Sequence, residues 1–339
     1  GVSATSYDTS KINAAYSKVV EYYKNNNNLN NADKILAVES LGLEAESNQF
    51  DTASANLSST SLSKKIVTEV LLGVDPTEDK KTLESQIDEN GNVEGSWGAS
   101  SDVWTLYALY VTSSEKTNLI ANKLNDELAA SSVCGYEWGG TYYADYDTTG
   151  WVIEGLAVVN KEKYATTINK AIDYIKNNTT MTTTGWVTAD NVDTQSQVLE
   201  GMFAYDTNAL LNDSYTVHPV DCLLNTQLSD GSFPSGYNAE YTTAEVAKTL
   251  GTYKNGSVII KAKKAYDKMM NPEQPDNTKP AQPTDTKKDS QSTNKVETTN
   301  QKTTSVKTGD ETNVVIFVSL SMVSGGLFLV LRKEYERVH

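Results

Sequence analysis

Residues 147–155 read DTTGWVIEG and residues 193–201 read DTQSQVLEG, so Asp-Thr at the start and Glu-Gly at the end recur 46 residues apart. Each stretch begins with Asp, a residue preferred at helix N-caps, and continues with a helical apolar pattern. A period of this length is typical of helix-pair repeats. The two stretches are therefore predicted to be equivalent helices of one internal repeat.

Four turns that combine glycine with an aromatic residue each precede such a polar helix start. The predicted capped helices cover 101–112, 148–159, 193–205 and 242–252, with two earlier members at 32–43 and 61–72. A second set lies between them, for example at 258–270. Six helices of one set alternating with six of the other would close a ring. No β-hairpin pattern is recognised around Asn90-Gly91, so the body is predicted to be almost wholly helical.

Two motifs carry a family resemblance. Residues 227–233, QLSDGSF, are similar to the Gln…Asp-Gly-aromatic element of prenyltransferase and squalene cyclase repeats. Residues 72–77, LGVDPT, resemble a signature of bacterial surface members of that superfamily. The resemblance covers most of residues 10–270 and implies an all-α fold, an α/α toroid with a central cavity.

Charge and cysteine content narrow the function classes. The formal net charge of -15 lies entirely in residues 1–272, because acids and bases balance in 273–339. The body has no arginine, since Arg332 and Arg337 are the only two, and nucleic acid is therefore excluded as an expected partner. Cys134 and Cys222 are predicted to be two thiols without a disulfide framework. No cofactor is expected.

The composition of the sequence changes after residue 272. Residues 273–304 are rich in Pro, Thr and Lys and are predicted to form a disordered linker after a toroid domain at 1–272. An apolar stretch at 314–331 has the length of a transmembrane helix, and the basic pair after it marks the cytoplasmic side. The chain opens at Gly1 without a basic or apolar leader, so we expect any signal peptide to be already missing.

Thr308-Gly309 precedes this apolar stretch. The order of spacer, Thr-Gly, apolar span and short basic tail in 305–339 resembles the sorting signals that sortases cleave between Thr and Gly. The resemblance implies sortase and peptidoglycan as partners, although Ser305-Val306 stands where the usual signal has Leu-Pro. The alternative is a plain single-pass anchor. Both place the body outside the cell, attached to the wall or the membrane.

Acidic and aromatic residues at the helix starts are the candidate ligand-binding set. In a closed ring they would gather at one mouth, as a rim for a cation or a sugar. The alternative is that the acids are helix caps and the aromatics fill the core. The predicted set is Trp97, Asp102, Trp138, Asp145, Asp147, Trp186, Asp190, Asp193, Phe233 and Glu240, with Tyr142, Tyr143, Trp151 and Tyr237 as further aromatics.

The sequence gives little support for the catalytic chemistries known in this superfamily. No Asp-x-Asp-Asp run is present for a cyclase, and Cys134-Gly135-Tyr136-Glu137 has Glu where a thioester needs Gln. His218, Asp221 and Cys222 are weak candidate zinc ligands, since Pro219 makes this segment an ordinary helix start. No metal site is predicted.

The leading interpretation is a non-catalytic binding protein of the cell surface, with a small molecule, a glycan or a protein as its extracellular ligand. The alternative is an extracellular enzyme, either a glycan-active hydrolase that uses rim carboxylates or a diverged terpenoid cyclase. The absent cyclase motif weighs against the second form.

Overall fold

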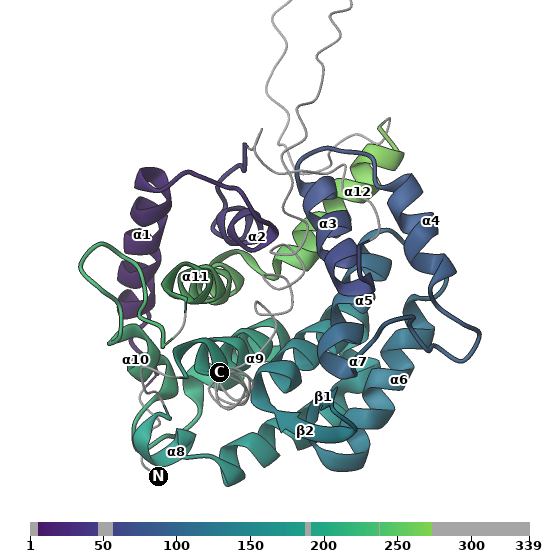
Figure 1. Ribbon diagram of the computed structural model, residues 1–339. Coiled ribbons are helices and arrows are strands. Elements are labelled where there is room, and N and C mark those ends of the chain that lie inside the picture. The colour runs from purple at the N-terminus through teal and green to yellow at the C-terminus, as the bar shows by residue number, and fades with distance from the viewer. Residues whose placement is uncertain (1–5, 47–56, 187–190, 237, 273–339) are drawn as a thin grey trace, which may run out of the picture.

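The computed structural model describes residues 6–46, 57–186, 191–236 and 238–272, and in these ranges the chain is mostly helical (Figure 1). The helices are α1 Ser10–Asn25, α2 Ala32–Ser40, α3 Ser59–Leu71, α4 Thr77–Ser85, α5 Ala99–Val111, α6 Thr117–Ser131, α7 Tyr146–Asn178, α8 Met181–Thr184, α9 Val192–Asn212, α10 Pro219–Leu224, α11 Ala239–Asn255 and α12 Val258–Met270. The strands are β1 Cys134–Trp138 and β2 Thr141–Asp145. All six predicted capped helices are confirmed, as α2, α3, α5, α7, α9 and α11.

The helices fall into two kinds by burial. Helix α5 is buried around almost its whole circumference, including every residue from Ala99 to Leu109. Helix α1 is buried only at Ile12, Ala15, Val19 and Tyr23, which are spaced to share one face. A helix buried on all sides needs neighbours on all sides. The repeat helices are therefore internal, and those between them form an outer layer.

Contacts between the internal helices follow chain order. Helix α2 packs against α3, α3 against α5, α5 against α7, α7 against α9, and α9 against α11. The last member, α11, packs against the first, α2. Outside them, α4 packs on α3 and α5, α6 on α5 and α7, and α1 on α10 and α11 (Figure 1). Helix α12 contacts α2, α3, α5 and α11.

Two glycines of the repeat let α7 and α9 approach closely. A Cβ atom on Gly150 would lie 2.5 Å from the carbonyl oxygen of Gln197, and one on Gly201 would collide with the carbonyl oxygen of Gly150. Such a distance is shorter than any van der Waals contact of carbon with oxygen. The glycines therefore set the spacing between the two repeat helices.

The helix ends expected after 159 and 205 also appear. Asn160 has non-helical dihedral angles inside α7, and its side chain accepts a hydrogen bond from the backbone N–H of Lys163 at 3.0 Å. Asp206 interrupts α9 in the same way and accepts from the N–H of Ala209 at 3.0 Å. Each break ends an internal helix and caps the outer segment that follows.

The expectation of a body without a β-hairpin is wrong. Strands β1 and β2 pair in antiparallel register from Cys134 with Asp145 to Trp138 with Thr141. Gly139 and Gly140, both with positive φ, form the two-residue connection. Gly-Gly is a hairpin signal when strand-forming residues flank it, and Tyr and Trp do so here. The glycine and aromatic turn predicted at 138–140 is present, but it joins two strands.

The two motifs that carry the family resemblance form local turns. In the first, Asp75 accepts hydrogen bonds from the backbone N–H and the hydroxyl of Thr77, which begins α4. In the second, the Gln227 side chain donates to the carbonyl oxygens of Ala15 and Gly231, both at 3.1 Å. The Gln227 contact with Ala15 joins this turn to α1.

Cys134 and Cys222 are both free, as predicted. The apolar stretch 314–331, the linker, Thr308 and Gly309 lie outside the described residues. Within the described ranges, none of the helices combines the length and the apolar character that crossing a bilayer requires.

Candidate functional site

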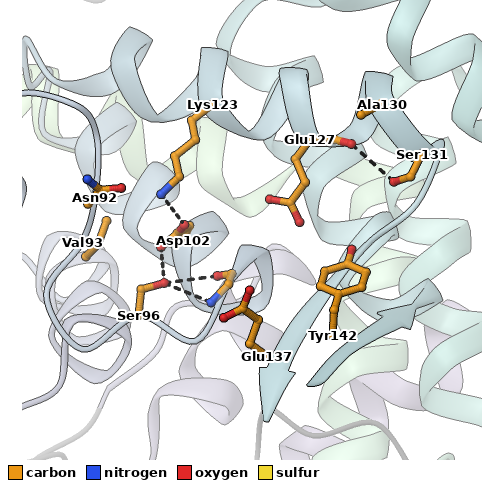
Figure 2. A pocket seen from close by; sticks show the side chains of 11 residues that line it. Asn92, Val93, Ser96, Asp102, Lys123, Glu127, Ala130, Ser131, Glu137 and Tyr142 are labelled. Atoms are coloured by element: carbon orange, nitrogen blue, oxygen red, sulfur yellow. Dashed lines mark hydrogen bonds and ion pairs between the residues drawn. The ribbon is translucent and has the colours of Figure 1, made fainter. Parts of the chain in front are cut away.

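A pocket of about 610 Å³ opens between α6, the β-hairpin and the loop that leads into α5 (Figure 2). This volume is in the range of small-molecule sites, roughly 300–1,000 Å³. We call it the hairpin pocket. Its lining residues are Asn92, Val93, Ser96, Gly98, Asp102, Lys123, Glu127, Ala130, Ser131, Glu137 and Tyr142.

Asp102 forms the inner wall of the hairpin pocket. It lies in the first turn of α5 with 2% of its surface exposed. The Ser96 hydroxyl donates to Oδ1 at 2.6 Å, and Lys123 Nζ lies 3.3 Å from Oδ2. Burial raises the pKa of Asp102, while Ser96 and Lys123 act in the opposite direction. Both carboxylate oxygens therefore already have partners within the protein.

The hairpin places Glu137 and Tyr142 on the same wall. These two residues are directly paired in the β1–β2 register, so their side chains project from the same face of the hairpin. The backbone N–H of Glu137 donates to the carbonyl oxygen of Trp97 at 2.8 Å, which fixes the hairpin against the loop before α5. A Cβ atom on Gly135 would lie 3.0 Å from the Tyr142 ring, so glycine leaves room for that ring.

Glu127 faces the hairpin from α6. Figure 2 shows its side chain pointing toward Tyr142 and Glu137. Burial, followed by the charge of Asp102, raises the pKa of Glu127. Burial, followed by the charge of Glu127, raises the pKa of Tyr142. The pocket thus holds two carboxyl groups, Glu127 and Glu137, that are not part of the Asp102–Lys123 ion pair.

A second group of charges lies among the internal helices. We call Glu154, Glu200, Glu245 and Lys248 the interior cluster; each is at most 3% exposed. Lys248 Nζ lies 3.1 Å from Glu245 Oε1 and 3.9 Å from Glu200 Oε2. The Ser257 hydroxyl donates to Glu154 Oε1 at 2.7 Å. Glu154 and Glu200 are the equivalent acids of the two repeats.

Burial controls the protonation of the interior cluster. It raises the pKa values of Glu154, Glu200 and Glu245, and the charge of Glu154 adds to the effect on Glu200. Burial lowers the pKa of Lys248, but the three carboxylates outweigh it and the net pKa is raised. Lys248 therefore stays charged, whereas the buried acids retain protons to higher pH than in water.

The predicted rim acids have different surroundings. Asp145 caps α7, since it accepts from the N–H of Asp147 and from the hydroxyl of Thr148. Asp147 and Asp193 are 4% and 5% exposed, and burial and the charge of Asp145 raise the pKa of Asp147. Glu240 is exposed and forms an ion pair with Lys34 at 2.9 Å. Asp190 lies outside the described residues.

The predicted aromatic residues differ in burial. Phe233 and Trp151 belong to the buried core, whereas Trp97 and Trp186 are partly buried against it. Trp138 is 48% exposed, on the face of the hairpin opposite to Tyr142. Of the nine predicted rim residues that the structure describes, the hairpin pocket contains Asp102 alone. Tyr142, one of the further aromatics, also lines the pocket. Tyr237 lies outside the described residues.

The weak zinc candidates all have other partners. His218 caps α10 by accepting from the N–H of Val220 at 3.2 Å, and Asp221 accepts from the Tyr7 hydroxyl at 2.6 Å. Cys222 Sγ lies 3.6 Å from the carbonyl oxygen of Thr184. Among the residues that the structure describes, no group of three or more His, Cys, Asp or Glu side chains is placed to hold a metal ion.

Three lining residues, Ser96, Lys123 and Glu127, were not predicted as site residues, and Glu137 was considered only for a thioester. Glu127 and Lys123 lie on α6, an outer helix without a turn motif of its own. The available signal was the hairpin, because the pairing of β1 with β2 puts Glu137 and Tyr142 on one face. The partner wall on α6 could not be found without tertiary contacts.

Comparisons with known proteins find no match to this chain among family models, curated proteins or solved structures. The likeness to prenyltransferase and squalene cyclase repeats therefore rests on the motifs in 72–77 and 227–233 and on the internal repeat.

Proposed function

We propose that the internal helices form an α/α toroid and that the protein is a non-catalytic, extracellular binding module. The toroid is supported by the order of helix contacts, in which α11 packs against α2 after α3, α5, α7 and α9 follow in turn. The outer helices pack on this series. A toroid built from helix pairs presents the loops between helices at its ends, where ligands are commonly bound.

The observation that carries the binding function is the hairpin pocket. It has the volume of a small-molecule site, and its polar residues Glu127 and Glu137 are joined by the half-exposed ring of Tyr142. Carboxylates beside an aromatic ring are suited to hydroxylated ligands such as sugars, because the acids accept hydrogen bonds and the ring packs on apolar sugar faces. We therefore propose a glycan or a related small polar molecule as the ligand.

The surface location rests on the sequence of 305–339. We propose that a sortase cleaves between Thr308 and Gly309 and joins the body to peptidoglycan, with 314–331 as the membrane span before cleavage. Replacing Thr308 and Gly309 with Ala is expected to move the protein from wall fractions to membrane fractions of the producing cells. Continued linkage of the variant to peptidoglycan fragments would contradict the sorting signal.

A glycan hydrolase is the second candidate. Its support is the position of Glu127 and Glu137 in one pocket, together with the raised pKa of Glu127, because a general acid must hold a proton that it can donate. Glu137, across the pocket, would be the second carboxylate that such enzymes use. Release of reducing ends from oligosaccharides by the wild type, abolished in Glu127→Gln, would establish this candidate over the non-catalytic one.

The binding function is tested on an array of immobilised glycans with the full chain and two variants. Ala130→Trp places a large side chain in the pocket from an exposed position of α6. Asp126→Trp is the matched control, since Asp126 is exposed on the same helix and does not line the pocket. We expect Ala130→Trp alone to lose binding. Equal binding by wild type and Ala130→Trp would exclude the pocket as the site.

A further inference from the structure

The four charged side chains of the hairpin pocket do not balance. Asp102 and Lys123 form an ion pair at 3.3 Å, in which the aspartate is 3% exposed and the lysine 35%. This pair leaves Glu127 and Glu137 on facing walls, with no second cation among the lining residues. With its carboxyl groups ionised, the pocket therefore carries an excess of negative charge and favours a positively charged ligand.

The hydrogen-bond donors of the pocket wall already serve other protein groups. The Ser96 hydroxyl donates to Asp102, and the Ser131 hydroxyl donates to the carbonyl oxygen of Val133 at 2.6 Å. The Asn92 amide donates to Asp88 at 2.9 Å. Besides its ion pair, Lys123 donates to the carbonyl oxygen of Gly91 at 3.1 Å. What the wall offers to a ligand is mainly acceptors, so a ligand that brings several N–H donors fits it best.

Tyr142 adds an aromatic surface between the two acids. Tyr142 is 46% exposed, and its ring lies close to Gly135, where a Cβ atom would be 3.0 Å from Cζ. The face of a tyrosine ring attracts ammonium groups as well as packing against apolar ligand surfaces. A compact cation near Tyr142 would meet this ring and the carboxylates together.

We propose that the hairpin pocket selects ligands with a protonated primary amine, such as amino sugars, and that Glu127 and Glu137 receive the ammonium group. This inference rests on the proposed binding function and names its ligand class. A positive charge placed beside Glu127 favours the ionised carboxylate, and its bound proton is then released to solvent. Binding is therefore accompanied by proton release at a pH where free Glu127 is partly protonated.

Isothermal titration calorimetry of the full chain with three probes tests the inference. The probes are glucosamine, N-acetylglucosamine, which lacks the positive charge, and glucose, which lacks the nitrogen. Because hydrogen bonds between charged partners are about twice as strong as neutral ones, glucosamine is expected to bind about ten-fold tighter or more than either control. Its heat is expected to vary with the ionisation enthalpy of the buffer, which reports the released proton.

Variants assign the effect to the two acids. Glu127→Gln and Glu137→Gln are each expected to reduce the glucosamine affinity about ten-fold and to reduce the preference for glucosamine over glucose. Asp126→Asn is the matched control, because it removes a charge from the neighbouring exposed position of α6. Loss of proton release in Glu127→Gln, with proton release kept in Asp126→Asn, would place the proton on Glu127.

The outcomes separate this inference from the proposed function. Equal affinity for all three sugars, abolished by Ala130→Trp, would overturn the amine selectivity and leave the pocket as a sugar site. Binding that Ala130→Trp does not affect would exclude the pocket and with it both proposals. No binding of glucosamine at millimolar concentration would likewise overturn the amine selectivity.

Discussion

The interior cluster and the hairpin pocket contain the same chemical groups in different surroundings. In the interior, Glu200 and Glu245 share one lysine with almost no exposed surface. In the pocket, Glu127 and Glu137 face a space of about 610 Å³. Carboxylates that already have buried partners stabilise or strain the fold, whereas carboxylates that face a pocket can exchange partners. The difference indicates which acids are structural and which can bind a ligand.

Removing the interior lysine is predicted to cause a large loss of stability. Lys248→Ala leaves Glu200 and Glu245 buried without their cation, and breaking a buried ion pair on one side costs about 3–5 kcal/mol. Urea denaturation measures the change in free energy of unfolding. The control is Lys81→Ala, an exposed pair with Glu78 that is worth less than about 1 kcal/mol. Equal losses in the free energy of unfolding for Lys248→Ala and Lys81→Ala would contradict a structural role for the interior cluster.

The same contrast between interior and pocket is predicted for the aromatic residues. Trp104 is 2% exposed, and the ammonium groups of Lys64 and Lys248 lie 4.6 and 5.4 Å from its ring centroid. Trp104→Ala is expected to cost about 3–5 kcal/mol. Tyr142→Ala in the pocket is expected to cost less than about 1 kcal/mol and to abolish ligand binding. Thermal unfolding of both variants compares their losses of stability. A loss in Tyr142→Ala as large as that in Trp104→Ala would contradict the prediction.

Stability is predicted to fall as the pH rises. A buried acid with a raised pKa binds its proton more tightly in the folded state than in the unfolded state, so folding is favoured at low pH. Glu154, Glu200 and Glu245 belong to this class, and so does Glu69, whose pKa burial raises from 4.5 to about 8. The melting temperature is therefore expected to decrease between pH 4.5 and 8.

Glu69→Gln sharpens this prediction, because an amide does not titrate. The decrease in melting temperature between pH 4.5 and 8 is expected to become smaller in this variant. Glu137→Gln, an exposed position of the pocket, is the control and is expected to keep the slope of the wild type. A melting temperature that rises with pH in this interval would contradict the raised pKa values of the buried acids.

The smallest stability effect is expected in the pocket. Glu137→Gln changes the charge of an exposed side chain, and such substitutions usually alter the free energy of unfolding by about 0.5 kcal/mol or less. The same variant is expected to lose affinity for amine ligands. Urea denaturation and calorimetry on one preparation measure both quantities. A loss of stability as large as that of Lys248→Ala would make Glu137 a structural residue.

Sequence predicted the repeat helices well because their signals are local. The Asp-Thr starts and the apolar period predicted the first segments of α7 and α9, at 148–159 and 193–205, and the breaks at Asn160 and Asp206 coincide with their expected ends. The β-hairpin was missed because Gly139-Gly140 was interpreted only as a turn between helices. Its strands have five residues each, which gives alternation little length in which to be recognised.

The candidate site was harder to predict for a physical reason. Polar residues at helix starts serve as caps in most proteins, and Asp145 does so here. The sequence cannot separate such an acid from one that faces a pocket, because burial depends on tertiary neighbours. Glu127 became a candidate only because α6 packs against the hairpin and α5, which brings it opposite Glu137.

Nuclear magnetic resonance of the ¹⁵N-labelled full chain during titration with glucosamine tests the central claim most directly, namely that the pocket binds the ligand and the interior cluster does not. The account predicts saturable shifts of the backbone amides of Gly98, Glu127, Glu137 and Tyr142. The amides of Glu154, Glu200 and Lys248 are predicted to remain unshifted. Saturable shifts confined to the interior residues, or a pocket whose amides do not respond, would contradict it.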